Sequence, residues 1–137
     1  MLVTGVFWGT WFTLTRSLES FSTEEFIHIG KVIIANVAIP MRILMPGCIL
    51  FMLLSLWVYP QKRSPRFYLN IIAFIFILST LLITLIVLVP IDNHINLWTV
   101  STVPSNFQEV RERWEYYHSI RTFTSLLSFV FFAASMR

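Results

Sequence analysis

The sequence predicts an all-α protein, a four-helix transmembrane bundle whose second and fourth helices extend into an outer polar crown. Composition is the first observation, because 56% of the 137 residues are hydrophobic and only 12% are charged. Soluble domains carry roughly 25% charged residues. The second observation is the uncharged run from Phe67 to Val89, which is long enough to cross a hydrocarbon core of about 30 Å.

We expect one integral membrane domain over residues 1–137, with spans at about 1–15, 41–59, 67–89 and 118–135. The segment 60–66 carries Lys62, Arg63 and Arg66 and no acidic residue. Positive charges mark the cytoplasmic side of short loops. We therefore predict that this loop and both termini are cytoplasmic, and that the segments 16–31 and 90–117 face outward.

Both outward segments contain signals for helices that continue into the spans. The stretch "STEE" from Ser22 to Glu25 matches the capping box S-x-x-E, which predicts a helix beginning at Thr23. That helix should continue into the second span and bend at Pro40 and Pro46, where backbone donors are missing.

The fourth helix should begin outside the membrane, capped by Ser105, and run without a breaker into the last span. About thirty residues at 1.5 Å each give roughly 45 Å, more than the apolar thickness of a bilayer. Between the third span and this helix, "VPIDNHINLWTVSTVP" is rich in turn formers. We expect it to form a structured loop over the bundle.

Four residues at the start of the last span share one helical face. Arg111, Trp114, His118 and Arg121 fall at offsets of three, seven and ten, within an arc of about 80°. Arg121 should lie about one turn inside the hydrocarbon boundary, where an ionisable side chain indicates a functional site. The alternative is an interfacial anchor, because Trp, Tyr and Arg are common at membrane surfaces.

Other polar residues are further candidates for binding a substrate. His94 lies beside Asn93, Asn96 and Trp98 in "IDNHINLW". Asn36 lies near Pro40, where its side chain either donates a hydrogen bond into the crown or caps the kink. The three histidines have no helical ligand spacing, so we predict no metal site. The lone cysteine cannot form a disulfide within the chain, and the small, uneven net charge of +3 argues against nucleic acid as a partner.

The pair "VPIDNHINLW" and "RERWEYYHSIR" is similar to the signature of the anthrone-oxygenase-like membrane proteins, a family of four-helix proteins. Characterised fungal members oxidise anthrones to anthraquinones with O₂ and without a cofactor. The resemblance implies a role for the following matched residues: Asn93, Asn96, Trp98, Arg113, Trp114, His118 and Arg121.

Two functional hypotheses follow. In the first, the protein is an oxygenase that needs no cofactor: His118 is the general base, Arg121 or Arg111 holds the oxyanion, and Trp114 and Trp98 flank the substrate ring. In the second, the crown binds a lipid or quinone without catalysis, or contacts a partner subunit in a homo-oligomer or membrane complex. A transporter is a weaker third reading, because few charges lie within the spans.

The polar face of the fourth helix can be interpreted as either a functional site or an interfacial anchor, and these two interpretations predict different orientations. If the face is a site, Arg111, Trp114, His118 and Arg121 point into the bundle rather than toward lipid. We expect Arg121 to meet a polar partner there, from the set Glu24, Glu25, Asn36 and Asn96. The guanidinium should also keep the neighbouring His118 imidazole neutral at pH 7.

Overall fold

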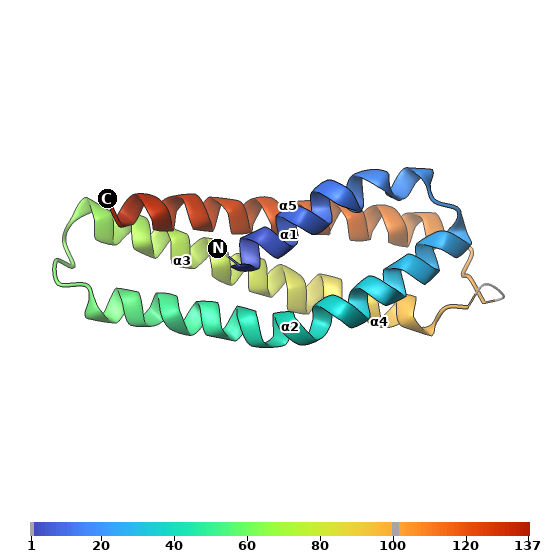
Figure 1. Ribbon diagram of the computed structural model, residues 1–137, viewed down its shortest axis with the longest axis horizontal. Helices are drawn as coiled ribbons and strands as arrows, with labels where there is room; N and C mark the ends of the chain where they lie inside the picture. The colour runs from blue at the N-terminus through green and yellow to red at the C-terminus, as the bar shows by residue number, and fades with distance from the viewer. Residues whose placement is uncertain (1, 100–101) are drawn as a thin grey trace.

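The computed structural model describes residues 2–99 and 102–137, apart from the side chains at positions 16, 18 and 19. The described chain is all-helical and forms four rods packed as a bundle (Figure 1). The rods are α1 (Leu2–Thr13), which leads into the short helix η1 (Thr15–Ser20); α2 (Thr23–Val58); α3 (Pro65–Ile83), which continues through η2 (Thr84–Leu88) into α4 (Val89–Leu97); and α5 (Phe107–Ser135). The predicted fold class is confirmed.

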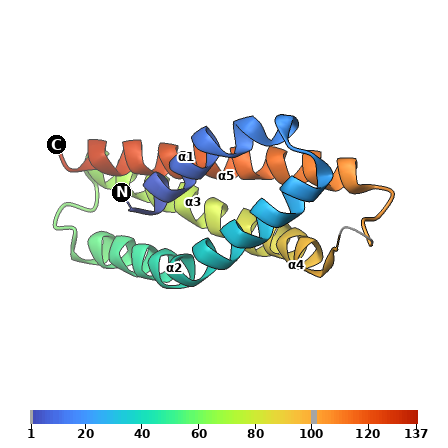
Figure 2. The same cartoon turned by 45° about the vertical axis from the view of Figure 1, so that its right-hand side comes forward.

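The elongated bundle has two ends, which can be followed in both views (Figures 1 and 2). The crown end holds η1, the start of α2, helix α4 and the start of α5. The loop end holds the α2–α3 connection and the C-terminus. Helix α3 lies along α5, while α1 crosses α5 and runs to the crown end (Figure 2). With 12 residues, or about 18 Å, α1 covers only part of the length of α5.

Helix α2 begins at Thr23, as the capping box predicts. The Ser22 side chain accepts a hydrogen bond from the Glu25 amide, and the Ser22 amide donates back to the Glu25 carboxylate at 2.8 Å. That backbone hydrogen bond stabilises the carboxylate and lowers the pKa of Glu25. The helix runs through Pro40 and Pro46 for 36 residues and changes direction in its middle (Figure 1).

The prediction of a loop after the third span was wrong for residues 89–97, because these residues form α4. A wide π turn makes this possible: the Val89 amide bonds to the Thr84 carbonyl, five residues back. Pro90 follows this wider turn directly. Its ring therefore does not clash with the preceding turn, as it would in a regular α-helix. The turn-forming residues Pro90, Asp92 and Asn93 consequently lie on a helix.

The predicted cap of the last helix was also wrong. Helix α5 begins at Phe107, its N-cap is Asn106 rather than Ser105, and the cap makes no side-chain hydrogen bond. Tertiary packing of Phe107 against Phe26, with ring centroids 5.4 Å apart, stabilises this helix start instead.

Two hydrophobic clusters form the interior. The crown-end cluster consists of Phe26, Ile27, Leu88, Ile95, Phe107 and Trp114. The second cluster, toward the loop end, consists of Val3, Phe7, Met45, Met52, Ala73 and Ile77. The polar residues discussed next lie where α1 and η1 meet α5.

Two helical segments of the described chain are long and apolar enough to cross a membrane, Thr23–Val58 and Pro65–Leu97. Many of their large apolar side chains are exposed, including Ile43, Phe51 and Trp57 on α2. A soluble monomer does not usually expose so large an apolar surface.

Candidate functional site

The buried face of α5 is polar along much of its length. Its buried residues are Phe107, Arg111, Trp114, His118, Thr122, Ser125, Ser128 and Ser135. Arg111, Trp114 and His118 therefore point into the bundle, as the helical spacing indicates. The serines and threonines farther along let α5 approach its neighbours closely, as in the bond from Ser128 Oγ to the Ala73 carbonyl at 2.8 Å.

His118 is the most deeply buried ionisable side chain on this face, with 2% of its surface exposed. Its Nδ1 lies 3.3 Å from the Thr15 hydroxyl of η1, and its carbonyl accepts a hydrogen bond from the Thr122 hydroxyl. Because the Thr15 hydroxyl can donate or accept, it can hold the ring in either neutral tautomer. The structure shows no hydrogen bond to Nε2 among the described residues, so that nitrogen is free to take a proton.

Trp114 connects His118 to helix α4. Its indole ring lies 4.8 Å from the imidazole ring, tilted by 34°. Its Nε1–H donates to Asp92 Oδ1 at 2.8 Å. The indole thus packs against one functional group and orients another.

Asp92 is a residue that sequence reasoning missed. Leu88, Asp92 and Ile95 share one face of the helical turn, and the two apolar members are almost completely buried. This spacing places the carboxylate toward the interior. This spacing places Asp92 inward only if the segment is a helix, whereas its turn-forming residues favour a loop.

Arg121 approaches the same group from one turn farther along α5. Its Cζ lies 4.3 Å from the centroid of the Phe7 ring on α1, a cation–π contact. Its charge attracts the Asp92 carboxylate and would repel a protonated His118 imidazole. Its buried Nε has no hydrogen-bond partner among the described residues.

The partners expected for Arg121 were wrong. Glu24, Glu25, Asn36 and Asn96 are all exposed, and Glu25 instead bonds to Ser22. Among the described residues, the acid whose charge acts on Arg121 is Asp92, which the continuation of α3 into α4 brings toward the interior, and the two side chains form no direct ion pair.

Arg111 is buried, but in a different place. Its Cζ lies 5.6 Å from the Phe26 ring centroid, in the crown-end cluster. Seven residues separate it from His118, or about 10 Å along the helix axis. Arg111 therefore lies farther from His118 along α5 than Arg121 does.

The other candidate residues do not join this group. Asn36, Asn93, Asn96 and Arg113 are exposed, because each lies on the outer face of its helix. Trp98 is half-buried and packs against Phe107 at 5.8 Å, while its carbonyl accepts a hydrogen bond from Lys31. Within the described residues, no three metal-ligating side chains gather in one place.

We call Asp92, Trp114, His118, Thr15 and Arg121 the buried polar group. Two cavities described in the structure lie elsewhere, and neither is lined by His118. Helices α1 and η1 supply Phe7 and Thr15, which cover the imidazole and the guanidinium.

Comparison with known proteins identifies the family. The family model described as anthrone oxygenase matches residues 34–131. This region contains all of the buried polar group except Thr15. No curated protein and no solved structure matches the chain. Because the match covers more than half of the sequence, including "IDNHINLW" and "RERWEYYHSIR", the chain belongs to the anthrone oxygenase family.

Proposed function

We propose that this protein is a membrane-embedded oxygenase that acts on a hydrophobic aromatic substrate of the anthrone type without a cofactor. The observation that carries the proposal is the buried polar group: an imidazole held by Thr15, with a guanidinium one turn away, in the region that matches the family. A base beside a cation is the arrangement that carbanion chemistry requires.

The proposed reaction begins at the methylene carbon between the aromatic rings of an anthrone. His118 Nε2 removes one proton, and the electron pair of the C–H bond becomes an enolate whose oxygen faces Arg121. The enolate reduces O₂ and forms a C–O bond, giving a hydroperoxide after protonation. Loss of the second C–H proton breaks the O–O bond and releases water. Anthrone and O₂ thus give anthraquinone and water, with no further oxidant.

Each remaining residue has a role in this scheme. Trp114 supplies an aromatic face beside His118, and Asp92 fixes the indole through its hydrogen bond. The Asp92 carboxylate also offsets the charge of Arg121 in a poorly hydrated place. Arg111 and Trp98 keep the crown-end cluster packed beside this group. The exposed Asn36, Asn93, Asn96 and Arg113 contact only those parts of a substrate that reach the surface.

The direct test is O₂ uptake and anthraquinone formation by the purified protein in lipid nanodiscs, with an anthrone as substrate. We expect a rate above spontaneous autoxidation that is lost when the protein is heat-denatured. No enhancement with any of several anthrones would contradict the oxygenase proposal.

The alternative, a protein that holds a lipid or quinone or joins a complex without turnover, is favoured by one observation: neither described cavity reaches His118. Mass spectrometry of molecules that co-purify with the protein separates the two functions. A tightly retained lipid or quinone, together with no O₂ uptake, supports the alternative.

We also propose that the bundle spans the membrane several times with the loop end in the cytoplasm. The outward apolar faces of α2 and α3 support membrane insertion, and the basic segment 60–66 supports this orientation. In a Cys48→Ser background, Gln61→Cys should resist an impermeant thiol reagent added to intact cells. Asn106→Cys, at the exposed start of α5, should react. The reverse pattern would invert the topology.

A further inference from the structure

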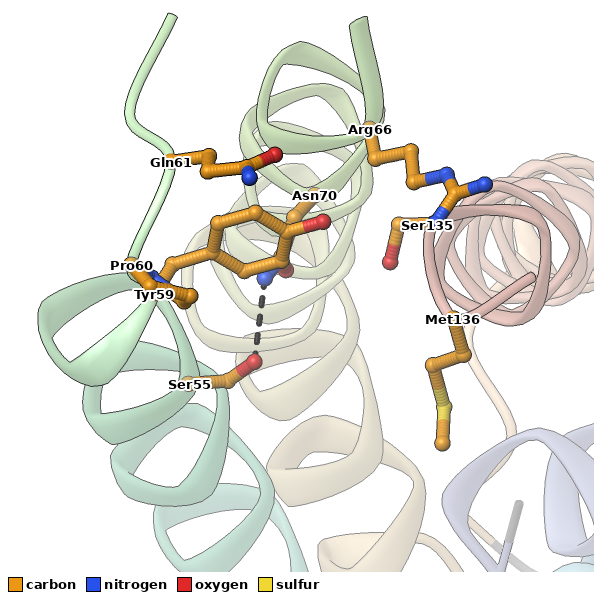
Figure 3. A pocket seen from close by; sticks show the side chains of 8 residues that line it. All are labelled: Ser55, Tyr59, Pro60, Gln61, Arg66, Asn70, Ser135 and Met136. Atoms are coloured by element: carbon orange, nitrogen blue, oxygen red, sulfur yellow. Dashed lines mark hydrogen bonds between the residues drawn. The ribbon is translucent and has the colours of Figure 1, made fainter. Parts of the chain in front are cut away.

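A cavity of about 450 Å³ opens at the loop end, remote from the buried polar group. It lies between the end of α2, the start of α3 and the end of α5 (Figure 3). The lining residues are Ser55, Tyr59, Pro60, Gln61, Arg66, Asn70, Ser135 and Met136. This volume lies within the range of small-molecule binding sites, about 300–1,000 Å³.

Asn70 gives the cavity an unsatisfied polar group. Only 1% of its surface is exposed, its Nδ2 donates to Ser55 Oγ at 3.0 Å, and its Oδ1 has no hydrogen-bond partner in the described structure. A buried amide atom without a hydrogen-bond partner destabilises the fold. Because the serine hydroxyl can donate or accept, one amide atom stays unpaired in either orientation of the amide. A ligand hydroxyl can satisfy both orientations.

The same cavity is electropositive. All seven acidic residues of the sequence occur within 19–25 or 92–115, segments that belong to the crown end. The loop end instead carries Lys62, Arg63 and Arg66, and Arg66 lines the cavity. The cavity also adjoins the N-terminus of α3, where the helix dipole favours an anion.

The side chains are arranged around a common space. Figure 3 shows Asn70 and Ser55 joined by their hydrogen bond at one side, with Arg66 and Ser135 at the other. The Tyr59 ring overlaps the Asn70 side chain in this view, and its hydroxyl points toward the Arg66 side. A ligand in this space meets a hydroxyl-binding group, an aromatic ring and a cation.

We propose that this cavity binds a phosphate that carries a polyol, as in the phosphoglycerol headgroup of a lipid in the adjacent leaflet. Arg66 pairs with the phosphate, and a glycerol hydroxyl bonds to the free amide atom of Asn70. The site is separate from the buried polar group, so it stands or falls independently of the oxygenase reaction.

The test compares two lipids of equal charge in binding to the full chain in detergent micelles, measured by native mass spectrometry. Phosphatidylglycerol has headgroup hydroxyls, whereas phosphatidylethanol has the same phosphodiester without them. We expect the protein to bind phosphatidylglycerol about fivefold more tightly, the worth of one hydrogen bond. Equal affinity for the two lipids would overturn the role of Asn70.

Two substitutions separate the two parts of the site. Arg66→Gln should lower the affinity of the protein for both lipids about fivefold, as expected for the loss of one partly exposed charge. The matched controls are Lys62→Gln and Arg63→Gln, which remove the same charge from exposed positions outside the cavity. An equal loss in all three variants would replace the site with a diffuse basic surface and overturn the proposal.

Asn70→Leu should abolish the preference for phosphatidylglycerol and leave the affinity for phosphatidylethanol unchanged. If this buried substitution prevents folding, the Arg66→Gln comparison still decides the proposal. A third arm adds glycerol 1-phosphate without lipid. Arg66-dependent binding of this probe supports the site and assigns its occupant to a soluble polyol phosphate, whereas binding of the lipid alone assigns it to the membrane. No Arg66-dependent binding of either probe overturns the site.

Discussion

Replacing His118 with asparagine should lower the rate of anthrone oxidation by about 10²–10⁴-fold, the usual contribution of a general base. The asparagine amide occupies nearly the same position as imidazole Nδ1, so it can keep the contact with Thr15. It has no atom at the position of Nε2, where we propose that the proton is taken. Activity should therefore fall while the bundle remains folded. The measurement is O₂ uptake in nanodiscs, with circular dichroism to verify the fold.

His94→Asn is the matched control for this experiment. His94 is an exposed histidine on α4 at the same end of the bundle, and it makes no contact with the buried polar group. We expect its activity to equal that of the unsubstituted protein. If His118→Asn retained the full enzymatic rate, the base would have to be another residue and the proposed chemistry would be wrong.

Replacing Arg121 with methionine should lower the free energy of unfolding by about 1 kcal/mol, because it removes the cation–π contact with Phe7 and the cation whose charge acts on the half-buried Asp92 carboxylate. Methionine retains much of the apolar packing of the side chain, so the loss comes mainly from charge and from the cation–π contact with Phe7. Denaturant unfolding in detergent micelles measures the change.

A double-mutant cycle tests the cause of this loss. Asp92→Asn removes the carboxylate charge but keeps an oxygen that accepts the Trp114 Nε1–H hydrogen bond. In the Arg121→Met background it should therefore restore part of the stability. Arg113→Met, at an exposed position, should change stability by less than about 0.5 kcal/mol. Strict additivity of Arg121→Met and Asp92→Asn would show that the two charges do not act on each other.

Some features of the protein follow from local sequence alone. The all-helical class and the long apolar helices follow from composition and from the length of the uncharged run, since neither depends on distant contacts. The start of α2 at Thr23 follows from Ser22 and Glu25, because a capping box involves only neighbouring residues. The inward orientation of Trp114 and His118 follows from helical periodicity along α5.

Other features depend on which segments meet in space. Pro90 and Asn93 signal a turn, yet the π turn at Thr84–Leu88 carries the helix past them, and packing of Leu88 and Ile95 holds it there. That continuation alone brings Asp92 to Trp114. Thr15 likewise reaches His118 only because η1 folds over α5.

The sequence by itself determined that Arg111, Trp114 and His118 face inward on the last helix, because spacing along one helix is a local property. Tertiary structure alone decided their partners. The partner expected for Arg121 was an acid or amide from Glu24, Glu25, Asn36 or Asn96, but the folded chain supplies Asp92 and the Phe7 ring. A buried charge requires a partner, but the helix that provides it is set by how whole elements pack, and no local pattern encodes that choice.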